Sequence, residues 1–266
     1  MATSPAAALG PISSRRRQEV TAHWAERGYP ASRSSSPALS SGVRAEFGRI
    51  HRRTGSPSAV PTQRLPVALQ PIWATNGVLL GHEYLYRSMS GRPAGVDRWV
   101  AARQDEASAS VLRTVFGDGV AAHQDRAVEE PSTLAFINVT RSFLVRDRPL
   151  PAPQGRLVLE VVETVPAHAG VLLGLRRLRA RGYLIAVDDY TASPDQLAMV
   201  PYADFVKVDC RDLAQLPRHA LERARRYGAR LVAEHVCDST MLSRALDLGF
   251  EYLQGDALGA ATTRTG

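Results

Sequence analysis

The sequence predicts a modified TIM barrel of the (β/α)8 type, an α/β fold with an antiparallel first strand, behind a disordered N-terminal tail. Eight short apolar runs follow Leu65, and helix-like segments separate most of them from the second run onward. Strands that alternate with helices pair in parallel through right-handed crossovers. Asn76 and Gly77 form a two-residue hairpin signal between the first two runs. That turn predicts a first strand antiparallel to the other seven.

The individual elements follow from hydrophobic periodicity and from the Gly, Pro, Asn and Asp residues between the runs. Strands are expected at residues 67–74, 77–87, 134–139, 157–162, 183–188, 205–209, 230–236 and 252–254. Helices are expected at residues 96–122, 170–181, 219–227 and 240–248, with a short one near Gln196. Eleven residues follow Gly255, so we expect the last helix of such a barrel to be truncated or absent.

The first 63 residues differ in composition from the rest of the chain. They are rich in Ala, Ser, Pro and Arg and have few large apolar residues, so we expect a disordered tail at 1–63 and a barrel domain at 64–266. Nine arginines and three glutamates give this tail 9 − 3 = +6 of the net charge of +7. The barrel domain is therefore close to neutral, which gives little support for nucleic-acid binding.

The composition also indicates the cellular compartment of the protein and whether it crosses a membrane. No apolar run approaches the ~18 residues that cross a membrane, and no apolar stretch follows Arg15, Arg16 and Arg17 as a signal peptide would require. The two cysteines, Cys210 and Cys237, make no disulfide framework. We therefore expect a cytoplasmic protein with no membrane partner.

Nearly every predicted strand ends in an acid or an amide. These residues are Glu83, Asn138, Glu160, Asp188, Asp189, Asp209, Glu234 and Gln254. In a parallel barrel such strand ends meet at one mouth. Several buried carboxylates without a counter-charge are prohibitively costly, whereas divalent cations neutralise them. Oxygen ligands without clustered His or Cys favour Mg²⁺ or Mn²⁺.

Lys207 is the only lysine among the 33 lysines and arginines of the chain. It lies in an apolar strand-like run, and Asp209 follows two residues later. An arginine keeps its proton in a protein, whereas a lysine near metal ions or in a dry pocket can lose it. The position therefore indicates a site where arginine would not serve. Taken singly, a strand-end acid such as Asp238 would only cap the following helix.

The motifs as a set resemble the EAL-domain cyclic-di-GMP phosphodiesterases, in the correct order over about residues 64–260. Gln70-Pro71-Ile72 resembles the QPI opening, and Glu83-Tyr84-Leu85-Tyr86-Arg87 resembles the E-A-L-x-R motif. Asn138, Glu160 with Glu163, and Asp188 with Asp189 stand where the family has V-N-x-S, E-x-T-E and D-D-F. Lys207 with Asp209, Glu234 and Gln254 with Gly255 match the K-I-D, A-E-G-V-E and QG motifs.

The resemblance implies hydrolysis of cyclic-di-GMP to linear pGpG by two Mg²⁺ or Mn²⁺ ions. The implied ligands of the first ion are Glu83, Asn138, Glu160 and Asp188. The implied ligands of the second are Asp188, Asp189 and Glu234. Lys207, with Glu234, is implied as catalytic through contact with the attacking water and the phosphate. Gln70, Arg87 and Gln254 are implied to face the substrate, Glu163 to anchor the loop after Asp189, and the barrel to form a homodimer.

Three departures from the family pattern leave an alternative open. Tyr84 replaces the central Ala, and Cys237 stands where the family has a second glutamate. We expect Cys237 to be a small buried thiol rather than a metal ligand. The loop after Asp189 lacks the glycines of active members, as in EAL domains beside HDOD modules. The alternative is an inactive EAL domain that senses cyclic-di-GMP or binds a protein partner.

Overall fold

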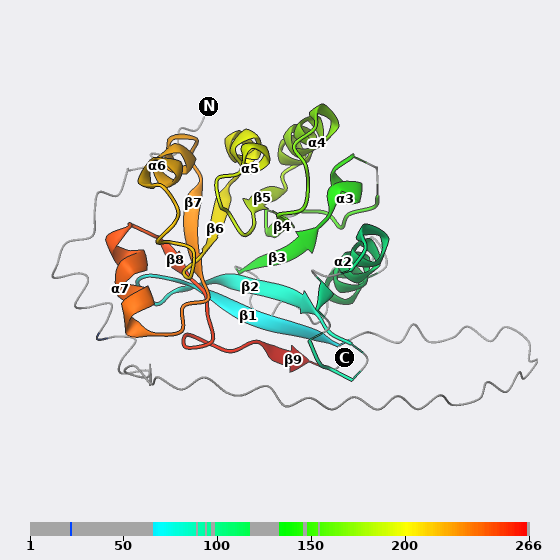
Figure 1. Cartoon of the computed structure of the whole chain (residues 1–266). Coiled ribbons are helices and arrows are strands. Elements are labelled where there is room, and N and C mark those ends of the chain that lie inside the picture. Colours follow the sequence, from blue (N-terminus) through cyan, green and yellow to red (C-terminus); the bar gives the residue numbers. More distant parts are fainter. Residues whose placement is uncertain are drawn as a thin grey trace, which may run out of the picture.

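Eight strands close into a barrel, and a ninth strand pairs with the first strand (Figure 1). A computed structural model of the chain describes residues 22, 66–88, 90–93, 95–96, 99–117, 133–145, 148–153 and 155–264. Apart from Ala22, the predicted tail at 1–63 lies outside the described residues, as does part of the helix predicted at 96–122. The tail and the domain boundary at residue 64 therefore stay predictions.

The strands are β1 (Val67–Ala74), β2 (Leu79–Tyr86), β3 (Leu134–Val139), β4 (Leu157–Val161), β5 (Leu184–Val187), β6 (Phe205–Asp209), β7 (Arg230–Glu234), β8 (Tyr252–Leu253) and β9 (Thr262–Arg264). The helices are α2 (Ala101–Phe116), α3 (Arg141–Val145), α4 (Ala169–Ala180), α5 (Pro194–Met199), α6 (Arg218–Arg226) and α7 (Ser239–Asp247), with a 3-10 turn at Val200–Tyr202. Helix α3 and strand β9 are additions to the predicted set.

The strand order confirms the predicted barrel. Strands β2 to β8 follow one another in parallel, and β1 is antiparallel both to β8 and to β2, which closes the ring. The predicted hairpin is present, because Gly77 N donates to Ala74 O at 2.8 Å and Gly77 has φ of 82°. Since Gly77 belongs to this turn, β2 begins at Leu79 and not at residue 77 as predicted.

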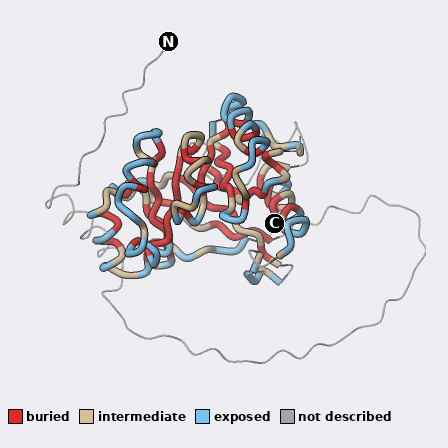
Figure 2. The backbone as a smooth tube through the Cα atoms, turned by 45° about the horizontal axis from the view of Figure 1, so that its top comes forward, coloured by how far each residue is buried: buried red, intermediate tan, exposed pale blue. Residues whose placement is uncertain are grey.

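Two apolar layers follow from the alternation of side chains along each strand. One layer lies inside the barrel and consists of fully buried residues: Ile72, Phe136, Val158, Ala186, Phe205 and Val232. The alternate strand residues, such as Val206 and Val208, belong to the larger core shared with the helices. Figure 2 shows this division as buried strands inside and exposed helix surfaces outside. Below the inner layer, the Arg230 guanidinium stacks 4.1 Å from the centre of the Phe205 ring.

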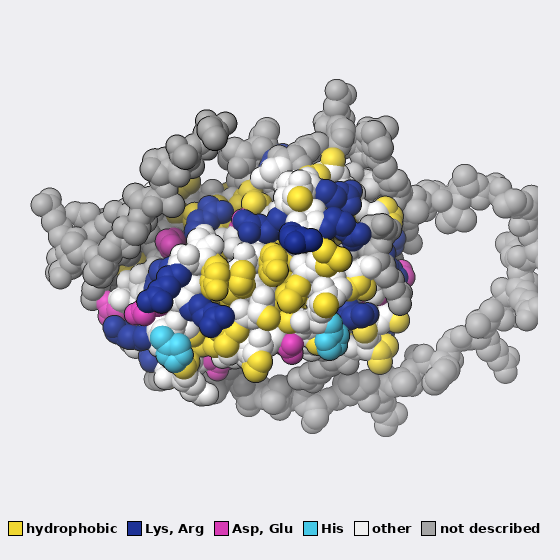
Figure 3. All heavy atoms as spheres, turned by 90° about the horizontal axis from the view of Figure 1, so that it is seen from above, with side chains coloured by type: hydrophobic (Ala, Val, Ile, Leu, Met, Phe, Trp, Pro, Cys, Tyr) yellow, Lys and Arg dark blue, Asp and Glu magenta, His cyan; other side chains and the backbone are white. Residues whose placement is uncertain are grey.

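Several arginine side chains lie on the face that α4, α5 and α6 cover (Figure 3). Exposed arginines on α4 and α6 are Arg176, Arg177, Arg179, Arg218, Arg223 and Arg226. Several lie in the last turn of their helix, where the partial negative charge of the helix end favours cations. These exposed arginines give positive charge to the outer surface of α4 and α6.

None of the described helices is long and apolar enough to cross a membrane. Asp238 caps α7 as predicted, since Met241 N donates to its Oδ1 at 2.8 Å.

Candidate functional site

The site lies directly above the inner apolar layer, because side chains two residues apart on a strand point to the same face. Residues two positions beyond the inner layer, toward the carboxyl ends of the parallel strands, are Asn138, Glu160, Asp188, Lys207 and Glu234. In antiparallel β1, Gln70 lies two positions before Ile72 and pairs with Glu83 of β2. The alternation that builds the core therefore brings the predicted polar residues to one mouth.

Lys207 is the centre of this cluster and is fully buried. Its Nζ lies 3.2 Å from Glu83 Oε2 and 2.7 Å from Glu160 Oε1. The same nitrogen lies 3.2 Å from Asp188 Oδ1 and 2.8 Å from Glu234 Oε1. One ammonium thus contacts carboxylates from four strands or strand ends.

Glu83 is also held by amide side chains. Asn138 Nδ2 donates to its Oε1 at 3.2 Å, and Gln254 Nε2 donates to its Oε2 at 2.6 Å. Gln254 Nε2 also contacts Gln70 Oε1 at 3.1 Å, and Gln70 Nε2 donates to Asp256 Oδ1 at 3.2 Å. The predicted residues of β1, β2, β3 and β8 therefore form one hydrogen-bonded network.

The pKa values of the acids show that one lysine does not neutralise the cluster. Burial would raise the pKa of Glu83, but Lys207 and the hydrogen bonds from the amides outweigh it and lower that pKa. Burial, together with neighbouring carboxylates, raises the pKa of Glu160 and of Glu234 well above the usual carboxyl value. The pKa of Asp188 is raised for the same two reasons. The cluster therefore binds protons or further cations more readily than ordinary carboxylates do.

The donor chemistry of this mouth fits a hard divalent cation. Buried oxygens that accept no hydrogen bond and no ion pair within the described residues are Asn138 Oδ1, Glu160 Oε2 and Gln254 Oε1, whereas Glu160 Oε1 and Asp188 Oδ1 contact the Lys207 ammonium. Such buried acceptors are costly unless a cation or a donor satisfies them. Among the described residues, no three His, Cys, Asp or Glu side chains are already spaced to hold a metal ion. The carboxylates face the Lys207 ammonium instead, so a metal ion would have to draw them away from it.

Asp189 lies beside the cluster on the exposed side. Burial and the charges of Asp188 and Glu163 raise its pKa to about 6. Its backbone is left-handed, with φ of 41°, which turns its side chain away from the strand direction of Asp188. A predicted second-ion ligand is thus adjacent to Asp188 but more accessible.

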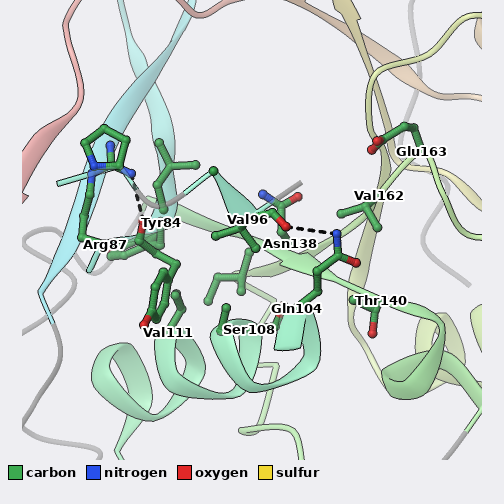
Figure 4. Close-up of a pocket in the computed structure, with 16 residues that line it drawn as sticks. Tyr84, Arg87, Val96, Gln104, Ser108, Val111, Asn138, Thr140, Val162 and Glu163 are labelled. Carbon is green, nitrogen blue, oxygen red and sulfur yellow. Dashed lines mark hydrogen bonds between the residues drawn. The ribbon is translucent and has the colours of Figure 1, made fainter. Parts of the chain in front are cut away.

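Arg87 and Glu163 line a cavity of about 250 Å³ between the mouth and α2 (Figure 4). The Arg87 Nη1 donates to Tyr86 O at 3.0 Å, and its side chain is close enough to Glu83 for their charges to interact. The cavity wall is mostly apolar, and its other polar members are Gln104, Ser108, Asn138 and Thr140. Glu163 is exposed, and its predicted anchoring of the loop after Asp189 stays a prediction.

Gln196 was missed as a site candidate, and Asp209 was expected at the mouth only as a strand-end acid, with no role assigned to it. Asp209 pairs in register with Glu234, is buried, and accepts hydrogen bonds from Arg211 N and Nε at 2.7 and 2.9 Å. Its place in the K-x-D motif was a signal for it. Gln196 is buried and binds the backbone at Asp188 and Asp189. The sequence signal for Gln196 is the S-x-x-Q pattern that begins at Ser193, which is typical of a helix cap and does not indicate a site residue.

Gly255 and Cys237 flank the site, the first closely packed and the second exposed. Gly255 follows Gln254, and a Cβ at this position would lie 2.3 Å from Val236 O, which explains why glycine occupies it. The expectation of a buried Cys237 is wrong, since the side chain is exposed and its Sγ lies 3.4 Å from Met241 Sδ. Cys237 is exposed because β7 ends at Glu234, before the strand reaches it.

The fold and the site define a modified TIM barrel with an acidic site at the carboxyl ends of its strands. The EAL domain family model matches residues 57–261, so the chain belongs to the EAL domain family.

Two curated proteins are similar in sequence to this chain. The cyclic di-GMP phosphodiesterase CdgJ of Vibrio cholerae is 27% identical over 194 residues, which cover 71% of this chain and 42% of the relative. The uncharacterized protein YuxH of Bacillus subtilis is 25% identical over 201 residues, which cover 72% of this chain and 46% of the relative. The chain thus spans less than half the length of these two curated relatives.

The solved structures share the fold. Bacillus subtilis YkuI, with an EAL domain, in complex with substrate c-di-GMP and calcium, has a TM-score of 0.56 at 20% identity, covering 74% of this chain and 54% of that one. The Klebsiella pneumoniae BlrP1 manganese and cy-diGMP complex at pH 6 has a TM-score of 0.62 at 20% identity, covering 78% and 58%.

Proposed function

We propose that this chain hydrolyses one phosphodiester of cyclic-di-GMP to give linear pGpG, with two Mg²⁺ or Mn²⁺ ions. The observation that carries the proposal is the cluster of buried carboxylates around one Lys207 ammonium, with buried oxygens of Asn138, Glu160 and Gln254 that accept no hydrogen bond among the described residues. Membership of the EAL domain family and the similarity to a named cyclic di-GMP phosphodiesterase support it. In the same proposal the protein acts in bacterial second-messenger signalling in the cytoplasm.

Each residue of the mouth then has a role in the proposed reaction. Glu83, Asn138, Glu160 and Asp188 would hold one ion, and Asp188, Asp189 and Glu234 would hold the other. When bound, the ions would lower the pKa of the attacking water and neutralise the phosphate. Lys207 would donate hydrogen bonds to that water and to a phosphate oxygen. Its ammonium is a compact point charge with three donors, which suits two acceptors in different directions.

The substrate would extend from the mouth toward the cavity. The Arg87 guanidinium would face a phosphate, while Gln70 and Gln254 would donate to substrate oxygens from the opposite side. Apolar atoms make up most of the wall of the neighbouring cavity, which suits a stacked base. Glu163 would anchor the loop after Asp189, and we also propose a homodimer through the barrel, which light scattering would test.

A chromatographic assay of cyclic-di-GMP with the full-length protein and Mn²⁺ tests the proposal. Turnover to pGpG that EDTA stops is expected. Glu83→Ala would remove it, because it takes away a carboxylate that Lys207, Asn138 and Gln254 contact. Lys207→Arg would reduce it severely, although the charge is kept. Binding of cyclic-di-GMP by the wild type without any turnover would instead favour the sensor alternative, which the glycine-free loop and Cys237 support.

A further inference from the structure

The turn that carries Asp188 and Asp189 has an unusual backbone for its sequence. The segment from Asp188 to Pro194 contains no glycine, yet Asp189 has φ of 41° and Ala192 has φ of 63°. Side chains other than glycine avoid this left-handed region, and alanine avoids it strongly. Contacts from elsewhere must therefore hold the turn in this shape.

The carboxamide of Gln196 makes those contacts from the first turn of α5. Its Oε1 accepts hydrogen bonds from Thr191 N at 2.9 Å, from Thr191 Oγ1 at 3.2 Å and from Ser193 N at 3.3 Å. Its Nε2 donates to Asp188 O at 3.1 Å and to Asp189 O at 2.9 Å. One side chain thus satisfies five polar groups of the turn, on both sides of Tyr190.

Gln196 is itself held firmly. Its side chain is buried, and its backbone N donates to Ser193 Oγ at 3.3 Å as part of a capping box with Pro194 at the helix start. A buried carboxamide with no freedom to turn fixes the atoms that it bonds. The contact is therefore between the rigid end of a helix and the backbone of two acids.

The other side of the same backbone is held by the barrel. Asp188 N donates to Val161 O at 3.1 Å, and Tyr190 N donates to Lys207 O at 2.9 Å. Gln196 binds the Asp188 and Asp189 carbonyls. The two acids are thus clamped between neighbouring strands and Gln196.

We infer that Gln196 is a positioning residue that directs the carboxylates of Asp188 and Asp189 toward bound divalent cations, in place of the glycines that the turn lacks. The inference rests on the proposed function, because it takes these acids as cation ligands. Glutamine is required at this position because both ends of its carboxamide are used. Glutamate would accept from the two amide N–H groups but would repel the two carbonyl oxygens, and methionine would satisfy neither set.

The test compares Gln196→Glu and Gln196→Met with the wild type in the full-length protein. The first measurement is the affinity for Mn²⁺ alone, by calorimetry. We expect a loss of about tenfold or more for both variants, as for other residues that orient ligands. The matched control is Gln215→Glu, which makes the same charge change at an exposed residue outside the site. It should bind Mn²⁺ within about twofold of the wild type.

The second measurement is hydrogen exchange of residues 188–197 without metal. Faster exchange of this segment is expected in Gln196→Glu, with the rest of the barrel unchanged. If this variant does not fold, Ala192→Gly combined with Gln196→Glu takes its place, since glycine removes the backbone cost of the turn. In a cyclic-di-GMP assay, kcat should fall and KM should change little, because the acids and not the substrate contacts are displaced.

The outcomes separate this inference from the proposed function. Gln196 variants with wild-type Mn²⁺ affinity and wild-type exchange at 188–197 would overturn the positioning role. A wild type that binds Mn²⁺ but never hydrolyses cyclic-di-GMP would overturn the proposed enzyme, while weaker Mn²⁺ binding by Gln196→Glu would still support the positioning role.

Discussion

Replacing Lys207 with methionine should destabilise the metal-free protein strongly. The change keeps most of the buried volume but removes the cation that lies within 3.2 Å of four carboxylates. Removing one partner of a buried ion pair costs about 3–5 kcal/mol, because the other charge is left uncompensated. For a folded part of about 200 residues, this corresponds to a fall in Tm of roughly 10 °C.

The loss should depend on pH in a defined direction. Burial raises the pKa of Glu160 and of Glu234 well above the usual carboxyl value, so the folded protein binds these protons more tightly than the unfolded chain does. The stability that their protonation contributes is fully present below the pKa of the unfolded chain. It is lost as the pH rises through the pKa of the folded protein. Without Lys207, protons are the remaining counter-charge. The variant should be closest to the wild type near pH 5 and weakest near pH 8.

Thermal unfolding in EDTA at pH 5 and pH 8 measures the loss of stability. A second series with added Mn²⁺ tests whether a divalent cation replaces the missing ammonium. Because the ammonium and a divalent cation compete for the same carboxylates, Mn²⁺ should raise the Tm of Lys207→Met more than that of the wild type. Arg179→Met is the control, since Arg179 makes an exposed ion pair with Asp204, worth about 1 kcal/mol or less. A Lys207→Met protein that unfolds within about 2 °C of the wild type at pH 8 in EDTA would refute the reasoning.

Three further predictions concern the turns around the mouth. The affinity for Mn²⁺ should weaken below pH 6, because Asp189 has a pKa of about 6 and must lose its proton to bind a cation. For one proton the loss is about tenfold per pH unit. Calorimetry at pH 5 to 8 checks this, and equal affinity at pH 5 and 7 would contradict it. Gly255→Ala should lower the free energy of unfolding by about 1–3 kcal/mol or more, because the new Cβ would lie 2.3 Å from the Val236 backbone. Urea unfolding measures the loss. Gly170→Ala is the control, since a Cβ there would lie 3.8 Å from its nearest neighbour atom. Ala192→Gly should stabilise the protein by about 1 kcal/mol by removing a left-handed alanine, and a lower free energy of unfolding would count against the strain.

Local patterns were enough to predict the barrel and most of its elements. β3 and β6 begin and end where the alternation predicts, because every second residue on these strands packs in the inner layer or in the helix-facing core. The gathering of Glu83, Asn138, Glu160 and Lys207 follows from the same alternation together with strand order. These features depend on period and connectivity, which a sequence contains.

Elements held by distant contacts could not be predicted in this way. Strand β9 is short, polar and fully exposed, and it exists because its backbone pairs with Val67, Ala68 and Leu69 of β1. Helix α3 has five residues, fewer than two turns, so it shows no periodicity. The five contacts of Gln196 depend on the path of a turn and not on any repeat. The exposed Cys237 likewise depends on where β7 stops pairing.

The register of β6 gives a physical reason for the single lysine. Lys207 pairs in register with Val232, a residue of the inner apolar layer, whereas Glu234 pairs with Asp209. A side chain at position 207 must therefore leave a closely packed apolar layer and place one cation among carboxylates that approach from several directions. The slender stem and three donors of lysine meet both demands, whereas the wide planar guanidinium of arginine presents its donors in one plane. A chain that uses arginine at every other basic position therefore has a steric and directional reason for lysine here.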